Sequence, residues 1–191
     1  MPNLPSLSED AGLYDVFRLD PALYQHWLRF SDLALRRRSE LSPVEREMLS
    51  LFVSRLNGAA YTAAAGEAAL ELAGGAPARV ARLVADDDER EVGERLRPIF
   101  RLARKLAADP ASVSRADTKA VLDQGWTEET LHQVVLVVCR AAFVDRLAIA
   151  SGLVPPDAAT SQRLAHLRLR HGFTPMVESL AREAGGSGGA A

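Results

Sequence analysis

The side chains that could carry out chemistry are concentrated between Leu41 and Leu70, in the sequence LSPVEREMLSLFVSRLNGAAYTAAAGEAAL. Glu47 could act as a general base if burial raised its pKa, although a glutamate in the second turn of a helix is most often solvated. The hydroxyls of Tyr61 and Thr62 could orient a polar ligand, or both side chains could simply pack between helices. The segment therefore offers acid–base and hydrogen-bonding groups but no thiol.

Thiol and imidazole groups are scarce, with one cysteine and four histidines in the chain. A single cysteine cannot form an intrachain disulfide, which favours a reducing compartment, and we expect a cytoplasmic protein. Cys139 lies in Val-Val-Cys-Arg-Ala, within the most apolar stretch, which predicts a buried structural thiol with a raised pKa. The histidines do not cluster, so we expect no metal site and no cofactor.

The composition is that of an ordinary globular protein. Of 191 residues, 48% are hydrophobic and 25% charged, and the formal net charge of −2 gives no electrostatic drive toward nucleic acid or an acidic membrane surface. The N-terminus lacks the pattern of a secretory signal, and no uncharged apolar run approaches the roughly 18 residues needed to span a bilayer. We therefore expect neither nucleic acid nor a membrane as a partner.

Helical spacing dominates the chain, and almost no sustained alternation of period two is present, so we predict an all-α fold. Ser42-Pro43-Val44-Glu45 has the pattern of a capping box, and apolar residues then recur every four positions until Asn57-Gly58. Further helices are predicted at 22–38, 59–73, 77–84, 91–108 (interrupted or started late by Pro98), 114–123, 127–152, after Pro156 through 170, and about 176–183.

The stretch 127–152 is hydrophobic almost all round between Val134 and Val144, which predicts burial in the core or at a subunit interface. Asp145 and Arg146 interrupt this apolar pattern. We expect them to be paired across helices or across subunits, because charged side chains are rarely buried alone.

Separate blocks of the sequence resemble the AhpD-like alkylhydroperoxidase and carboxymuconolactone decarboxylase family, in particular its peroxidase-related branch. The blocks are LSPVEREM (41–48), GWTEE (125–129) and FVDRL (143–147), similar to the branch's L-S-P-x-E-R-E-M, Gly-Trp-Ser-(Asp/Glu)-Glu and Phe-x-Asn-Arg-Leu. The resemblance covers about 41–153. It implies an AhpD-like multi-helix bundle, with 1–184 as a single domain and 185–191 as a flexible Gly/Ser/Ala tail.

The branch's redox motif, N-x-C-x-Y-C-x-x-H-H, is altered at its reactive positions. Ala59 and Thr62 stand where the resemblance places two cysteines, and Gly66 where it places a histidine. Neither alanine nor threonine can form a sulfenic acid or a disulfide. The resemblance identifies Glu47 as the surviving acid–base position, and it makes pocket candidates of Asn57, Ala59, Tyr61, Thr62 and Gly66.

Three kinds of function remain open. The first is a peroxidase-related protein that has lost its dithiol and the antioxidant oxidoreductase turnover, and has kept a small-molecule pocket. The second is a cofactor-free acid–base enzyme of the carboxymuconolactone decarboxylase type, with Glu47 as base. The third is a structural partner of an active paralogue. The resemblance also implies a homo-oligomer (dimer, trimer or hexamer), as do the apolar faces of two predicted helices.

Overall fold

The computed structural model describes residues 2–186, which contain α-helices and short 3₁₀ turns but no strand. The all-α prediction is therefore confirmed for this part of the chain. The α-helices are α1 (Leu13–Phe17), α2 (Pro21–Arg36), α3 (Pro43–Leu56), α4 (Ala60–Leu72), α5 (Pro77–Ala85), α6 (Arg97–Ala108), α7 (Arg115–Leu122), α8 (Glu128–Ser151), α9 (Ala158–His171) and α10 (Thr174–Gly186). The 3₁₀ turns are η1 (Glu89–Glu91), η2 (Glu94–Leu96) and η3 (Pro110–Ser112).

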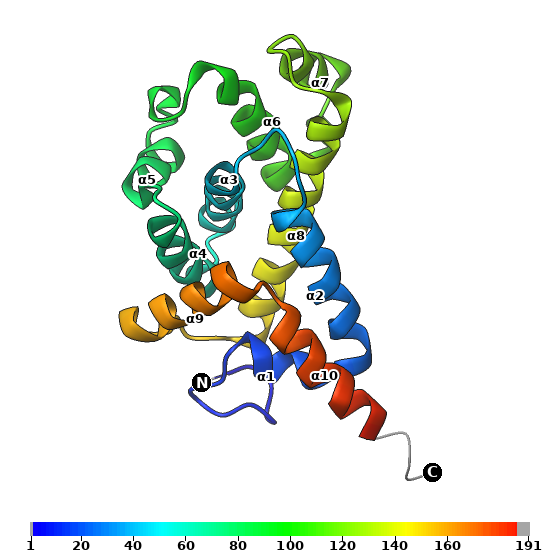
Figure 1. Ribbon diagram of the computed structural model, residues 1–191. Coiled ribbons are helices and arrows are strands. Elements are labelled where there is room, and N and C mark those ends of the chain that lie inside the picture. Colours follow the sequence, from blue (N-terminus) through cyan, green and yellow to red (C-terminus); the bar gives the residue numbers. More distant parts are fainter. Residues whose placement is uncertain (1, 187–191) are drawn as a thin grey trace.

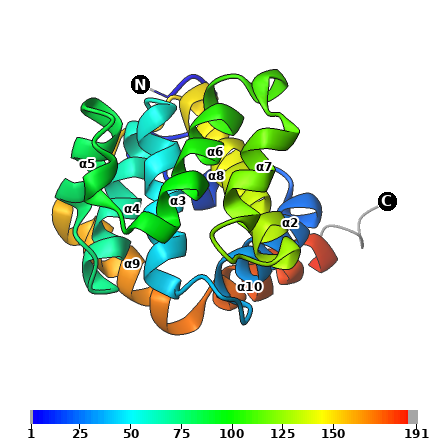
Figure 2. The same ribbon diagram turned by 90° about the horizontal axis from the view of Figure 1, so that it is seen from above.

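Helix α3 occupies the centre of the bundle. It contacts α2, α4, α5, α6 and α8, and both Figure 1 and Figure 2 show these helices arranged around it. Helix α9 packs on α4, and α10 lies along α2. Because α3 carries Glu47, its central place decides that this side chain faces other helices rather than water.

The start of α3 is determined locally, as its sequence predicts. The Glu45 amide donates to Oγ of Ser42 at 3.2 Å, and the Ser42 amide donates to a Glu45 carboxylate oxygen at 2.7 Å. This capping box, with Pro43 in the first turn, satisfies amides that would otherwise lack partners. The helix ends at Asn57, and Gly58 takes the left-handed conformation with φ of 65°.

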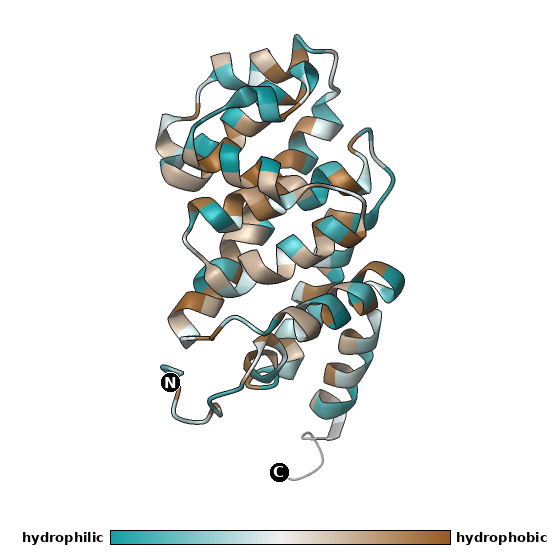
Figure 3. Ribbon diagram, turned by 90° about the vertical axis from the view of Figure 1, so that its left-hand side faces the viewer, coloured by the Kyte–Doolittle hydropathy of each residue, from teal (hydrophilic) through white to brown (hydrophobic). Residues whose placement is uncertain are grey.

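The main core fills the space between these helices with large apolar side chains, including Leu28, Leu49, Leu51, Phe52 and Leu102. The Phe52 and Phe100 rings meet edge to face with centroids 5.1 Å apart. Figure 3 shows polar and apolar residues interspersed along the helices, the pattern expected when each helix buries only one face.

Helix α8 differs from its prediction, because one strip of it is exposed. Cys139 is exposed, and the Phe143 side chain keeps 43% of its surface accessible. The expectation of a buried structural Cys139 is therefore wrong for the single chain. The neighbours α2, α3, α4, α6 and α7 cover the other sides of α8, and an all-round apolar pattern cannot indicate which side they leave open.

Smaller differences concern helix ends. Helix α1 was not expected, because a helix of five residues leaves little periodicity to detect. The segment 91–108 begins its helix late, at Arg97, with Pro98 in the first turn. Helix α10 runs to Gly186, so the first two residues of the expected flexible tail are helical, and 187–191 lie outside the described residues. None of the described helices has the length and apolarity needed to cross a membrane.

Candidate functional site

Glu47 is buried and forms an ion pair. Its side chain is on the second turn of α3, the residue is 6% exposed, and one carboxylate oxygen accepts a hydrogen bond from Nη2 of Arg168 at 2.6 Å. Arg168 reaches it from α9. The solvated alternative for Glu47 is therefore wrong, because its side chain is buried and paired with the positive charge of Arg168.

A buried carboxyl lies at the centre of a second polar group. Asp145 on α8 is fully buried, and its Oδ1 accepts hydrogen bonds from Oγ of Ser54 at 2.8 Å and Oγ1 of Thr62 at 2.5 Å. Its Oδ2 accepts one from Nδ2 of Asn57 at 2.8 Å. Burial raises the pKa of Asp145 above its ordinary value, and the hydrogen bonds from Thr62, Asn57 and Ser54 partly oppose that rise. Asp145 is thus paired across helices, as expected, whereas Arg146 donates to the Ala142 carbonyl of its own helix.

Ala59 and Gly66, which have no reactive group where the family resemblance places a cysteine and a histidine, are tightly packed. Ala59, at the N-terminus of α4, is 1% exposed and donates its amide to the Ser54 carbonyl at 3.0 Å. Gly66 lies against α3, and a β-carbon added there would stand 3.3 Å from Cδ1 of Leu51. An imidazole at position 66 would need space that Leu51 now fills.

Tyr61 lies beneath the N-terminal segment. It is 9% exposed, and its hydroxyl oxygen accepts a hydrogen bond from the Leu13 amide at 3.2 Å. Gly12 approaches so closely that an added β-carbon would lie 2.9 Å from the same oxygen. Burial raises the pKa of Tyr61. Of the two alternatives for this residue, the contacts correspond to packing between elements.

Arg140 is a buried charge that the sequence did not single out. It is 7% exposed and donates through Nη1 to Oγ of Ser50 at 3.3 Å. Its guanidinium lies 5.6 Å from the ring centroids of both Trp27 and Phe173. Burial, and next the positive charge of Arg168, lower the pKa of Arg140 to about 10.

The structure therefore brings Glu47, Asn57 and Thr62 together with five residues that the sequence did not place in the site, Ser50, Ser54, Arg140, Asp145 and Arg168. One signal could have indicated the serines. They follow Glu47 by three and seven positions, so the three side chains share one face of α3. Nothing in the local sequence indicates that Arg168 meets Glu47, because these residues are 121 positions apart.

Two surface pockets of the described structure lie elsewhere. One, of about 220 Å³, is bordered by α3, α5, α6 and α7, and the other, of about 290 Å³, by α6 and α7. Neither is lined by Glu47, Tyr61 or Thr62. In the described residues no group of three or more His, Cys, Asp or Glu side chains is arranged to hold a metal ion.

The only thiol lies on another side of α8 from the Asp145 group. Cys139 and Asp145 are six residues apart on one helix, which separates them by about 9 Å along the axis and about 120° around it. Asp145 faces α3 and α4, whereas Cys139 is exposed. The two groups therefore do not form a common site within one chain.

Comparisons with known proteins agree with the resemblance. Residues 21–105 match the model of the carboxymuconolactone decarboxylase family, a range that begins and ends earlier than 41–153. No curated protein matches the chain. Among solved structures, an uncharacterized peroxidase-related protein from Silicibacter sp. TM1040 is similar with a TM-score of 0.70 and 21% identity over 78% of each chain.

A second solved structure is described as an alkylhydroperoxidase AhpD core, an uncharacterized peroxidase-related protein from Ralstonia eutropha JMP134. It is similar with a TM-score of 0.69 and 20% identity, and covers 77% of this chain and 78% of its own. At these identities the structures establish the fold. Residues 21–105 are thus similar to the carboxymuconolactone decarboxylase family, and the chain has the AhpD-like helical fold.

Proposed function

We propose that this protein works without thiol-peroxidase turnover and binds a small polar molecule at one buried polar group between α3, α4, α8 and α9. We call it the buried group, and it consists of Glu47, Ser50, Ser54, Asn57, Thr62, Arg140, Asp145 and Arg168. The observation that carries the proposal is the contact of Thr62 with Asp145. At a position where the family resemblance places a cysteine, the chain has a hydroxyl that is hydrogen-bonded to a buried carboxyl. A hydroxyl has no oxidised states comparable with sulfenic acid or disulfide.

The loss of thiol chemistry is tested with tert-butyl hydroperoxide and dithiothreitol. We expect the wild type and Cys139→Ser to consume peroxide at the same background rate, because Cys139 faces away from the Asp145 group. Turnover in the wild type that disappears in Cys139→Ser would contradict the proposal.

Retention of a binding site is tested by thermal-shift screening of small polar molecules. We expect a compound that raises the melting temperature of the wild type and has no effect on Ser50→Ala, since Ser50 belongs to the buried group. Ser112→Ala is the matched control, because that serine is exposed at η3. A screen without any stabilising compound, or one whose hits act equally on both variants, would count against the site.

Cofactor-free acid–base chemistry is the second candidate, and the raised pKa of Asp145 favours it. Arg168 holds Oε2 of Glu47, so a proton would be accepted at Oε1. The test is turnover of a small lactone or carboxylate, compared among the wild type, Glu47→Gln and Asp145→Asn. Loss of turnover in either variant would favour this candidate over binding alone.

Self-association is a further part of the proposal, in preference to assembly with an active paralogue. An apolar surface formed by Leu23, Trp27, Cys139 and Phe143 lies on α2 and α8, where the Trp27 and Phe143 rings stack at 5.1 Å. Apolar surface of this kind is normally covered by a partner. The mass measured by light scattering should be at least twice 20.6 kDa. Phe143→Glu should lower this mass, whereas Leu72→Glu, at an exposed position of α4, should leave it unchanged. A mass of 20.6 kDa for the wild type would contradict this part.

A further inference from the structure

Arg140 has a weaker hydrogen-bond partner than the other arginines whose Nε is buried without an acceptor. Four arginines bury an Nε that has no hydrogen-bond acceptor, namely Arg37, Arg46, Arg55 and Arg140. The first three still donate to a carboxylate or a carbonyl oxygen through a terminal nitrogen. Arg140 donates only to the neutral hydroxyl of Ser50, at 3.3 Å. A buried guanidinium with five N–H groups and one weak acceptor is costly, and it favours an additional acceptor.

The unused part of Arg140 is the edge formed by Nε and Nη2. Elsewhere in this protein the same edge holds carboxylates by two parallel hydrogen bonds, in the pairs Arg82–Glu91, Arg90–Asp88 and Arg101–Glu89. Among the described residues no acceptor meets this edge of Arg140. The geometry of the edge matches the two oxygens of a planar carboxylate.

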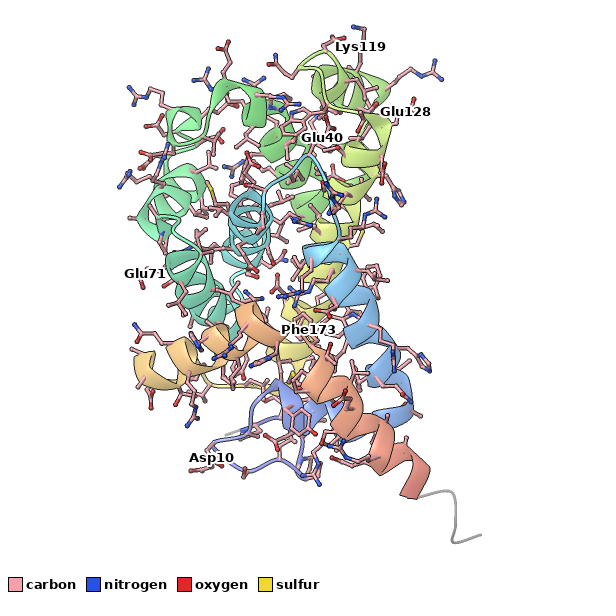
Figure 4. The ribbon with its side chains drawn as sticks, viewed as in Figure 1. Asp10, Glu40, Glu71, Lys119, Glu128 and Phe173 are labelled. Atoms are coloured by element: carbon pink, nitrogen blue, oxygen red, sulfur yellow. The ribbon has the colours of Figure 1, made fainter. Side chains whose placement is uncertain are left out.

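We propose that Arg140 anchors the carboxylate of a small organic acid through Nε and Nη2. This inference rests on the proposed function, because it names the ligand class of the same buried group. The rings of Trp27 and Phe173, each 5.6 Å from the guanidinium, form its apolar walls. Phe173 lies in the short link between α9 and α10, labelled in Figure 4, and follows Gly172 at φ of 66°.

The surrounding charges favour a singly charged ligand. Arg168 repels Arg140, and an anion between them would relieve that repulsion, whereas Glu47 and Asp145 attract Arg140 and would repel the anion. With two positive and two negative side chains in the group, a monocarboxylate fits better than a phosphate dianion, which would add more negative charge than the arginines can balance.

The test uses the fluorescence of Trp27. The chain has two tryptophans, so Trp126→Phe leaves Trp27 as the only reporter, beside Arg140. Sodium propionate is titrated at constant ionic strength maintained with sodium chloride. Propionamide, which has the same shape without the charge, and inorganic phosphate are titrated in parallel. We expect a saturable change with propionate, none with propionamide, and a weaker change with phosphate.

Variants at position 140 complete the test. In the same background, Arg140→Gln should raise the Kd for propionate by about tenfold or more, since two charge-assisted hydrogen bonds are lost. Arg140→Lys keeps the positive charge but lacks the paired N–H groups of the guanidinium. Its Kd for propionate should lie between those of the background and Arg140→Gln, and it preserves the test if the glutamine variant does not fold. The exposed Arg170→Gln is the matched control and should bind as the background does.

A response to propionate no different from that to chloride or propionamide would overturn the assignment, as would unchanged binding in both Arg140 variants. These outcomes would leave the proposed function standing if another class of compound binds the group. Peroxide turnover through Cys139 would instead refute the proposed function, whatever the result with propionate.

Discussion

The hydroxyl of Thr62 donates a hydrogen bond to Oδ1 of Asp145 at 2.5 Å. This bond joins the first turn of α4 to the C-terminal half of α8. Ser54 and Asn57 complete the set of donors around this fully buried carboxyl. The hydroxyl at position 62 therefore stabilises the bundle at the place where the family resemblance would put a reactive thiol.

Replacing Thr62 by valine keeps the shape of the side chain and removes the donor. We expect Thr62→Val to lower the free energy of unfolding by about 1–3 kcal/mol, because a buried carboxyl loses a partner. Urea denaturation measures the change. Thr118→Val on α7 is the control, since that hydroxyl bonds only to the Arg115 carbonyl of its own helix in an exposed setting. Equal effects in the two variants would show that the Asp145 contact does not contribute.

The raised pKa of Asp145 predicts a pH dependence of stability. Because the folded protein holds this proton more tightly than the unfolded chain, ionisation of Asp145 opposes folding. The cost is absent below the ordinary value of 3.8 and is complete once the pH exceeds the raised folded value. Asp145→Asn removes this term, and the amide can still bond to the surrounding hydroxyls.

Unfolding of the wild type and Asp145→Asn should therefore be compared from pH 4 to pH 8 by urea denaturation. Relative to the variant, the wild type should lose stability as the pH rises. Carboxylates with depressed pKa values, such as Asp117 at about 2, are common to both proteins and cancel in the difference. A difference that does not change with pH would show that Asp145 does not titrate in this range.

Glu40 predicts the opposite pH dependence. It accepts hydrogen bonds from Thr130 and Thr127 at the start of α8, and these lower its pKa from 4.5 to about 2. A depressed folded pKa contributes stability above 4.5 that is lost as the pH falls toward 2. Glu40→Gln should therefore lower the melting temperature at pH 7 and have little effect near pH 2. Glu71→Gln, at an exposed position of α4, should change neither, and calorimetry distinguishes these results.

Gly66→His should destabilise the bundle. A β-carbon added at position 66 would lie 3.3 Å from Cδ1 of Leu51, so an imidazole there would force the two helices apart or displace Leu51. We expect a loss of about 1–3 kcal/mol in urea denaturation. Ala60→His, at an exposed position of α4, should have a much smaller effect. If both variants unfold alike, the α3–α4 contact is looser than these distances indicate.

Helix boundaries were largely predictable because capping and proline effects are local. The Ser42–Glu45 capping box and the late start at Pro98 require only residues within a few positions of each other. Exposure along α8 could not be predicted in the same way. Val134 to Val144 is apolar on almost every side, with Arg140 as its one charge, so only the placement of the neighbouring helices decides that Cys139 is exposed and Arg140 buried.

By itself, the sequence determined that this chain is helical and that 41–70 contains no cysteine, because both follow from residue type and local spacing. Only the tertiary structure decided that Glu47 pairs with Arg168, that Thr62 and Asn57 converge on Asp145, and that Arg140 keeps one edge without an acceptor. These contacts join residues 83 to 121 positions apart. Their formation depends on how α3, α4, α8 and α9 pack, and no local pattern of residues encodes that packing.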